Sequence, residues 1–172
     1  MLSNFLRGFI DGALSTLGVV IGASSASSLI IISAGIGGTV ANAISNLLSA
    51  FSAESATRYA GLRDLEKSMV DRKLKGSILD RRIQWQTLRA GGVDGLGTFL
   101  GGALPVIPYA VLPPGEALFV SIGVVILAIS FVGVYLGRVS KSSILLSVLK
   151  MVVLGLLVAG LVYLLQRALI PS

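Results

Sequence analysis

The chain carries no charged residue between Asp11 and Glu54, a stretch of 42 residues. A membrane-spanning helix needs about 20 consecutive apolar residues, so this stretch has the length of two spans joined by a tight turn. The serine-rich segment 23–28 is the natural place for the turn, because its hydroxyl groups can hydrogen-bond the free backbone groups at helix ends. We therefore expect helices over about 8–25 and 29–53.

Three further apolar segments follow. The uncharged runs 95–115 and 117–137 each have the length of one span, and a fifth helix is expected over about 144–166. The four prolines between 105 and 114 are expected to end or bend the third helix, because proline lacks the backbone N–H that a helix needs. Only 13% of the residues are charged, against about 25% in soluble domains. The sequence thus predicts an all-α membrane protein with five transmembrane helices.

The positions of the basic residues predict the orientation of these spans. Nine of the 14 Lys and Arg residues lie between Arg58 and Arg89, in the loop joining the second and third helices. Arg7 marks the N-terminus, and Arg138 and Lys141 mark the loop between the fourth and fifth helices. Cytoplasmic loops are the ones rich in Lys and Arg, so we expect the N-terminus inside and the C-terminus outside. The net charge of +6 then reflects topology, and no nucleic-acid partner is expected.

The segment 54–90 is the one substantial polar part of the sequence. Its apolar residues recur at roughly helical spacing, and Gly76 is a natural break between two helices. We expect a short cytoplasmic helical hairpin that extends the second and third spans. The chain then divides into residues 1–53 with two spans, the insert 54–90, and residues 91–172 with three spans, all in one membrane domain.

A short motif occurs twice. Asp11-Gly and Asp94-Gly are each followed by a hydroxyl residue four positions after the aspartate and then by Leu-Gly, at a constant offset of 83 residues. An aspartate near the hydrocarbon is costly and often marks an ion path. The alternative interpretation is a helix N-cap, which Asp supplies well. We favour the ion path, because each motif brings oxygen atoms and small residues together.

The missing residue types restrict the chemistry. The chain has no cysteine and no histidine, so a cation site must use oxygen atoms, with a thioether available only from Met1, Met69 or Met151. No serine lies beside a base, so we do not expect an enzyme, and no resident cofactor is expected. Any metal ion would be a transported substrate.

Three segments resemble the vacuolar iron transporter family. They are DGALSTLGVVIGAS (11–24), AGIGGTVANAISN (34–46) and FLGGALPVIPY (99–109), which is similar to the family's third-helix motif of small residues followed by Pro-x-x-Pro-Tyr. The resemblance covers nearly the whole chain. It implies a homodimer with five spans per chain that exchanges Fe²⁺ or Mn²⁺ for protons and moves the metal out of the cytoplasm.

The resemblance also assigns site residues. Asp11 corresponds to the family's pathway aspartate, whereas Asn46 stands where the family has its methionine. Gly38 and Ala50 stand where members of the family carry glutamates. The candidate metal ligands are five residues with oxygen-bearing side chains: Asp11, Ser45, Asn46, Asp94 and Glu54. Such hard ligands suit Mn²⁺ or Mg²⁺ as well as Fe²⁺.

The leading hypothesis is a proton-coupled divalent-metal transporter. The main alternative is a membrane protein of the same fold that has lost transport and serves as a packing or partner subunit, and a third hypothesis is a transporter of another solute. We expect a homodimer packed through the first helix, with Gly18 and Gly22 at the seam, because small residues let transmembrane helices approach closely.

Overall fold

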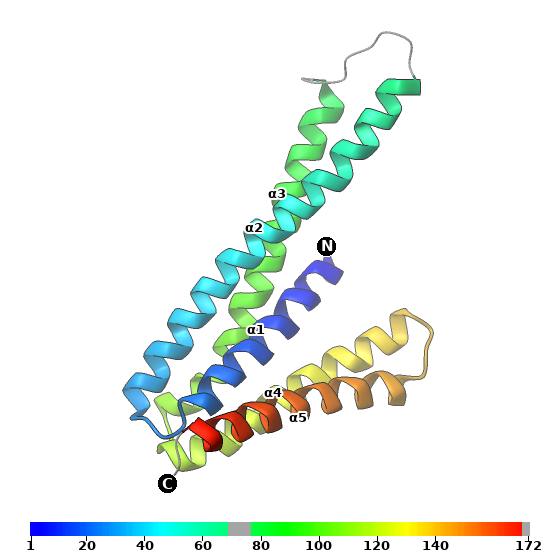
Figure 1. The fold of residues 1–172 in the computed structure, drawn as a ribbon. Helices are drawn as coiled ribbons and strands as arrows, with labels where there is room; N and C mark the ends of the chain where they lie inside the picture. Colours follow the sequence, from blue (N-terminus) through cyan, green and yellow to red (C-terminus); the bar gives the residue numbers. More distant parts are fainter. Residues whose placement is uncertain (69–76, 170–172) are drawn as a thin grey trace.

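The chain is built from long helices. The computed structural model describes residues 1–68 and 77–169, and within these residues it has five α-helices, one short 3₁₀-helix and no strand (Figure 1). In chain order they are α1 (Leu2–Gly22), α2 (Ser28–Ser68), α3 (Ile78–Ala103), η1 (Ile107–Ala110), α4 (Pro114–Val139) and α5 (Ile144–Leu169). The all-α prediction is confirmed.

Four of the five helices in the described residues are long and apolar enough to cross a membrane. These are α1, α2, α4 and α5. The helix α3 does not qualify, because its 26 residues include Asp80, Asp94 and three arginines. The chain is therefore a multi-helix membrane protein, and its fifth span remains a prediction.

The first two helices begin and end elsewhere than predicted. The turn falls within 23–28 as expected, but α1 starts at Leu2 and α2 does not stop near residue 53. It continues unbroken to Ser68, a length of about 60 Å at 1.5 Å per residue. No glycine, proline or cap interrupts α2 near residue 53, so the change from apolar to polar sequence marks a change of surroundings and not the end of a helix.

The polar insert is thus formed by continuations of α2 and α3, which run side by side beyond the other helices (Figure 1). Two hydrogen bonds join them there. The Tyr59 hydroxyl donates to Asp80 Oδ1 at 2.9 Å, and Arg58 donates to Gln86 Oε1 at 2.6 Å. The predicted break at Gly76 lies outside the described residues.

The third predicted span, 95–115, is wrong in its second half. The helix α3 ends at Ala103, and η1 occupies 107–110 before α4 begins at Pro114. Pro105 and Pro108 cannot donate backbone hydrogen bonds, so the α-helix cannot continue through them. The Ser121 hydroxyl instead donates to the carbonyl of Pro105 at 2.7 Å. The expectation that the prolines end this helix is confirmed.

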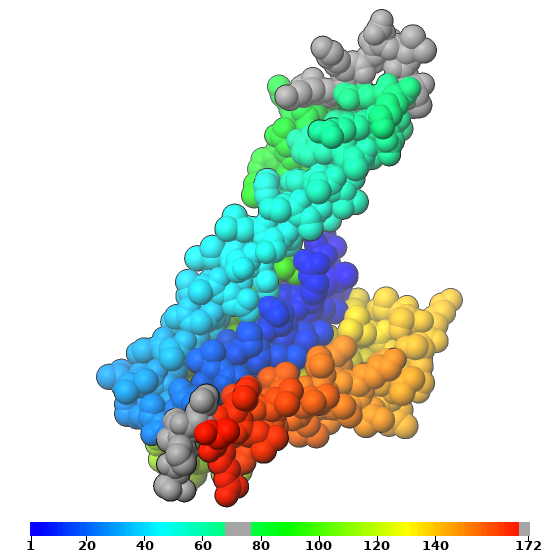
Figure 2. Space-filling view, viewed as in Figure 1, coloured from blue at the N-terminus to red at the C-terminus, as the bar shows by residue number. Residues whose placement is uncertain are grey.

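The helix α1 lies at the centre of the bundle and contacts each of the other four α-helices. Figure 2 shows part of α1 as a strip between α2 and α5. Gly18 and Gly22 lie against Val162 of α5, where an added Cβ would meet that side chain at 3.6 Å in each case. The face predicted as a dimer seam is therefore covered by a helix of the same chain, because the C-terminal half of α5 folds back along α1.

Candidate functional site

Four glycines hold α1 and α3 in close contact. A Cβ added to Gly8 or Gly12 would lie 2.1 Å from the carbonyl oxygen of Asp94 or 2.0 Å from that of Thr98, respectively. A Cβ on Gly97 or Gly101 would lie 2.3 Å or 2.1 Å from a carbonyl oxygen of α1. No side chain fits at such distances, so the two backbones touch directly, as small residues allow between membrane helices.

This close packing brings both motif aspartates into one region, but neither caps a helix. The N-cap residues are Met1 for α1 and Ser77 for α3. Asp11 lies in the third turn of its helix and Asp94 far along its own, so neither can satisfy free N–H groups at a helix start. The N-cap interpretation of the aspartates is wrong.

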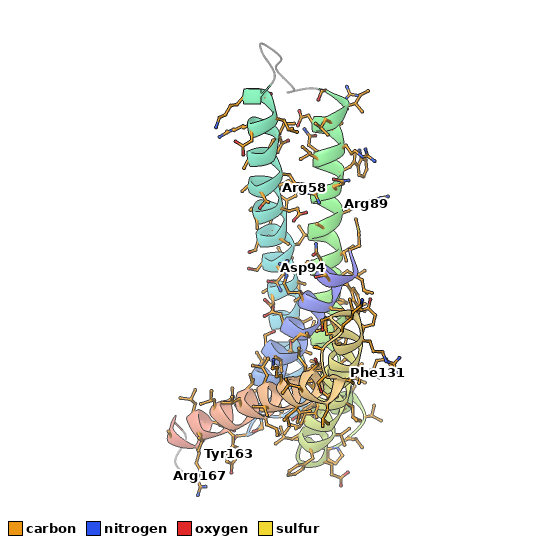
Figure 3. All side chains as sticks on the ribbon, turned by 90° about the vertical axis from the view of Figure 1, so that its right-hand side faces the viewer. Arg58, Arg89, Asp94, Phe131, Tyr163 and Arg167 are labelled. Atoms are coloured by element: carbon orange, nitrogen blue, oxygen red, sulfur yellow. The ribbon has the colours of Figure 1, made fainter. Side chains whose placement is uncertain are left out.

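Asp94 is buried and paired. Its side chain is 3% exposed, and its Oδ1 accepts a hydrogen bond from Nε of Arg7 at 3.1 Å. The Arg7 side chain is 63% exposed, so Arg7 lies on the outer side of this ion pair and Asp94 on the buried side. Figure 3 shows Asp94 where α1, α2 and α3 come together. The negative charge predicted as a metal ligand here already has a cationic partner within the chain.

Asp11 has different partners. Its Oδ2 accepts hydrogen bonds from the amide nitrogens of Asn42 at 2.9 Å and Asn46 at 2.7 Å. Asn42 also donates to the Ser15 hydroxyl at 2.8 Å, and Asn46 to the Thr98 hydroxyl at 2.9 Å. The Asn46 amide of α2 thus joins the motif on α1 to the motif on α3, whereas Asn42 bonds to the α1 motif. Within the described residues, no cationic side chain pairs with the Asp11 carboxylate.

A cleft of about 300 Å³ lies over these groups. Its lining consists of Arg7, Asp11, Asn46, Ser49, Ala50, Ala53 and Asp94. Both motif carboxylates therefore face one space, in which Asp94 is covered by the Arg7 guanidinium and Asp11 is exposed. A second cavity, of about 320 Å³, has Thr39 as its only polar lining residue, so it offers no comparable site for a cation.

Two predicted ligands lie outside the cleft lining. Ser45 lies on the exposed side of α2, and Glu54 accepts a hydrogen bond from Nε of Arg58 at 2.9 Å. The structure therefore brings together Asp11, Asn46 and Asp94 of the five candidates. It adds Asn42 and Arg7, which the sequence analysis did not single out. Both lie four residues before a chosen residue, Asn46 or Asp11, and so on the same helix face.

The cluster can offer a cation one unpaired carboxylate and several neutral oxygens. In the described residues, no three Asp or Glu side chains lie close enough together to hold a metal ion. In the arrangement seen, amide N–H groups of Asn42 and Asn46 occupy the place beside Asp11 that a cation would take. Turning each amide by 180° would present its oxygen instead. The set would then match the oxygen ligands that Mg²⁺ and Mn²⁺ prefer.

Comparisons with known proteins bear on this arrangement. The sequence profile of the VIT family matches residues 53–167, which include Asp94 and the whole of α4. A protein of Methanocaldococcus jannaschii described as uncharacterized is 43% identical over 166 residues, which cover 95% of this chain and 87% of that protein.

Proposed function

The chain belongs to the VIT family, and from that premise we propose that it carries a divalent metal ion across the membrane, with Asp11 as the principal binding carboxylate. One observation supports the choice of Asp11 above the others. Its carboxylate faces a cleft among apolar helices, and only neutral amides hold it. A carboxylate kept near hydrocarbon without a cation is costly, and that cost is relieved by a bound cation or by a proton.

We propose Fe²⁺ or Mn²⁺ as the substrate and protons as the coupling ion, with export from the cytoplasm. Asn46, Ser49 and the Asn42 amide supply the neutral oxygens. Proton coupling requires a group that binds the metal in one state and a proton in the other, and the proposal gives this function to Asp11. The metal is the substrate, and the proposal includes no resident cofactor and no enzymatic step.

The chain is proposed to act as a homodimer. Its dimer interface, or seam, is placed on α2 and not on the α1 face that contains Gly18 and Gly22. Small residues recur every four positions of α2 as an exposed stripe that winds around the helix by about 40° per step: Ser33, Gly37, Ala41, Ser45, Ser49 and Ala53. A Cβ on Gly37 would have no atom within 4 Å, so the stripe has room for a neighbour. Because Ser49 and Ala53 also line the cleft, a second copy packed on this stripe would cover Asp11 and add its own oxygens.

This seam can be tested by cross-linking, since the chain has no native cysteine. Ser45→Cys in membranes should form a disulfide-linked dimer on mild oxidation. Gly123→Cys, at an exposed glycine of α4 with no atom within 4 Å of its Cβ position, is the matched control and should stay monomeric. Cross-linking of both variants to the same extent would show random collision and exclude this seam.

The proposed topology has five spans, with the N-terminus and the insert in the cytoplasm. The C-terminal end of α5 supports it, because Gln166 donates hydrogen bonds to Ser24 and Ser25 in the α1–α2 turn, at the end of the bundle away from the N-terminus (Figure 1). Ser77→Cys should react with an impermeant thiol reagent from the cytoplasmic side, and Ser27→Cys from the other. The same topology predicts that Ser172→Cys, which lies beyond the described residues, also reacts from the outside. Reaction of Ser27→Cys and Ser77→Cys from the same side would exclude five spans.

A second candidate function is a non-transporting subunit of the same fold. The Arg7–Asp94 pair favours it, because it removes one of the two carboxylates from metal binding. Flux measurements separate the two functions. Purified protein in liposomes should take up Fe²⁺ or Mn²⁺, faster with an opposing pH gradient, and should release protons in return. Protein-free liposomes are the control. If no divalent metal moves above that control under either condition, transport of divalent metal is excluded, and the non-transporting subunit and the transporter of another solute remain.

A further inference from the structure

One face of α3 stays exposed along nearly the whole helix. Its residues follow one another at intervals of one, three or four positions, so they form a single stripe: Ile78, Arg81, Arg82, Trp85, Leu88, Arg89, Gly92, Leu96 and Phe99, all exposed. We call this stripe the outer face of α3. Figure 3 shows Arg89 pointing away from α2 on this side.

The composition of the outer face changes sharply after Arg89. From Gly92 to Phe99 it carries only glycine and apolar side chains, as a surface in contact with lipid tails does. Between Arg81 and Arg89 it combines three arginines with Trp85, which is 66% exposed, and Leu88, which is 52% exposed. Tryptophan and basic residues concentrate where a membrane helix passes from hydrocarbon to headgroups. The distance along the helix from Arg89 to Trp85 is about 6 Å at 1.5 Å per residue, close to the thickness of one headgroup layer.

The three arginines have no partner within the part of the chain that the structure describes: none of them makes a hydrogen bond or an ion pair there. Asp80, which precedes Arg81, is buried and accepts a hydrogen bond from Tyr59 on α2, so its charge does not face the outer side. An open hollow of about 370 Å³ lies beside one of them, lined by Arg81, Gln84, Trp85 and Leu88. Three guanidinium groups without a partner in the described residues, next to an exposed tryptophan, form a positively charged surface that favours binding of an anionic group at the membrane surface.

We propose that the outer face of α3 between Arg81 and Arg89 binds the phosphate headgroups of anionic lipids. The arginines contact the phosphates, Trp85 lies at headgroup level, and the acyl chains follow the apolar part of the face toward Phe99. Juxtamembrane basic residues attract anionic lipids through their charge, with about a fivefold gain in binding for each residue. This site does not depend on metal transport or on the cleft at Asp11.

The test uses the single tryptophan of the chain as its reporter. The full-length protein is reconstituted in bilayers that mix phosphatidylglycerol and phosphatidylcholine, with bromine atoms on the acyl chains of one lipid at a time. Bromine quenches only nearby tryptophan, so the two quenching curves give the relative affinity of the two lipids beside Trp85. We expect phosphatidylglycerol to be preferred severalfold.

Matched variants identify the groups responsible. Arg81→Gln combined with Arg89→Gln should lower the preference severalfold, to the part that Arg82 alone supplies. Arg63→Gln combined with Lys67→Gln removes the same charge from exposed positions of α2 and should leave the preference intact. All four residues are exposed, so each variant should keep its circular dichroism spectrum and elute as the wild type does. Equal quenching by both lipids in the wild type, or equal loss in both variants, would overturn the proposal.

Two additions exclude other occupants. Millimolar inorganic phosphate, compared with chloride at equal ionic strength, should not displace phosphatidylglycerol. Full displacement by phosphate would make the face a site for free anions. Diluting the protein tenfold in lipid should leave the quenching unchanged. A preference that appears only upon dilution would mean that a second copy of the chain covers the face, which contradicts lipid as its occupant.

Discussion

The two copies of the Asp-Gly motif, residues 11–18 and 94–101, have the same spacing and opposite surroundings. Asp94 is buried and paired with Arg7, whereas Asp11 is exposed in the cleft and held by amides alone. The contacts of α1 and α3 advance in the same direction, Phe5 with Gly97 and then Phe9 with Gly101, so the helices are parallel. In this register Asp11 lies one to two turns further along the pair than Asp94, roughly 5–10 Å at 1.5 Å per residue.

The difference supports the proposal that the two copies of the motif have different functions. In α3, Gly97, Gly101 and Thr98 form the surface on which α1 packs, and the aspartate serves this packing through its pair with Arg7. In α1, the aspartate faces outward beside α2, where a cation could reach it. We therefore assign Asp94 to structure and Asp11 to binding. Substitutions at equivalent positions of the two copies test this assignment.

The largest difference is expected at the last glycine of each motif. Gly101→Ala would place a Cβ 2.1 Å from the backbone carbonyl of Phe9, and the two helices would have to separate. We expect a loss of about 3 kcal/mol or more in the free energy of unfolding, or no folded protein, as for severe overpacking. Gly18→Ala meets only Val162 at 3.6 Å and should be neutral or stabilising by up to about 1 kcal/mol, because alanine favours helix. Thermal unfolding in detergent measures both, and equal losses would refute the distinction.

The next largest difference concerns the stability effect of the aspartates. Asp94→Asn removes the charge that pairs with Arg7 at a buried position, and we expect a loss of about 1.5–3 kcal/mol, the range for a hydrogen bond between charged groups. Asp11→Asn should change stability by less than about 1 kcal/mol, since the site is exposed and the new amide retains an oxygen for Asn42 and Asn46. The unfolding midpoints of the two variants give the comparison. A larger loss at Asp11 would assign the structural function to the wrong copy.

The smallest difference is expected at the hydroxyl residues. Thr98 is fully buried, donates to the carbonyl of Asp94 at 3.0 Å and accepts from Asn46, so Thr98→Val should cost about 1–2 kcal/mol. Ser15 is exposed, and Ser15→Ala leaves Asn42 bonded to Asp11, so its cost should stay within about 0.5 kcal/mol. Chemical unfolding followed by circular dichroism measures the free energy of unfolding of each variant and resolves the difference between them. Similar values for the two variants would mean that the α3 copy has no special packing function.

The sequence predicted the helices better than their ends. An uncharged run marks a membrane segment but not a helix end, because α2 continues without a break from its apolar part into the polar insert. The prolines correctly predicted the end of α3, because their effect is local. The region around Asp11 was predicted from one motif and one resemblance, whereas its true neighbours depend on how α2 crosses α1. Asn42 could have been chosen from its spacing to Asn46. The Arg7–Asp94 pair depends on the register of α1 against α3, which no local pattern reveals.

Metal binding by the Asp11→Asn variant tests the central claim most directly. Free Mn²⁺ gives an electron paramagnetic resonance signal that disappears on binding, so a titration of purified protein in lipid nanodiscs counts bound ions. We predict saturable binding by the wild type, retained binding by folded Asp94→Asn, and at least a tenfold loss of affinity in Asp11→Asn, since removing a coordinating charge costs more than about 1.4 kcal/mol. If Asp11→Asn binds Mn²⁺ as the wild type does while Asp94→Asn does not, the assignment of the two aspartates is wrong.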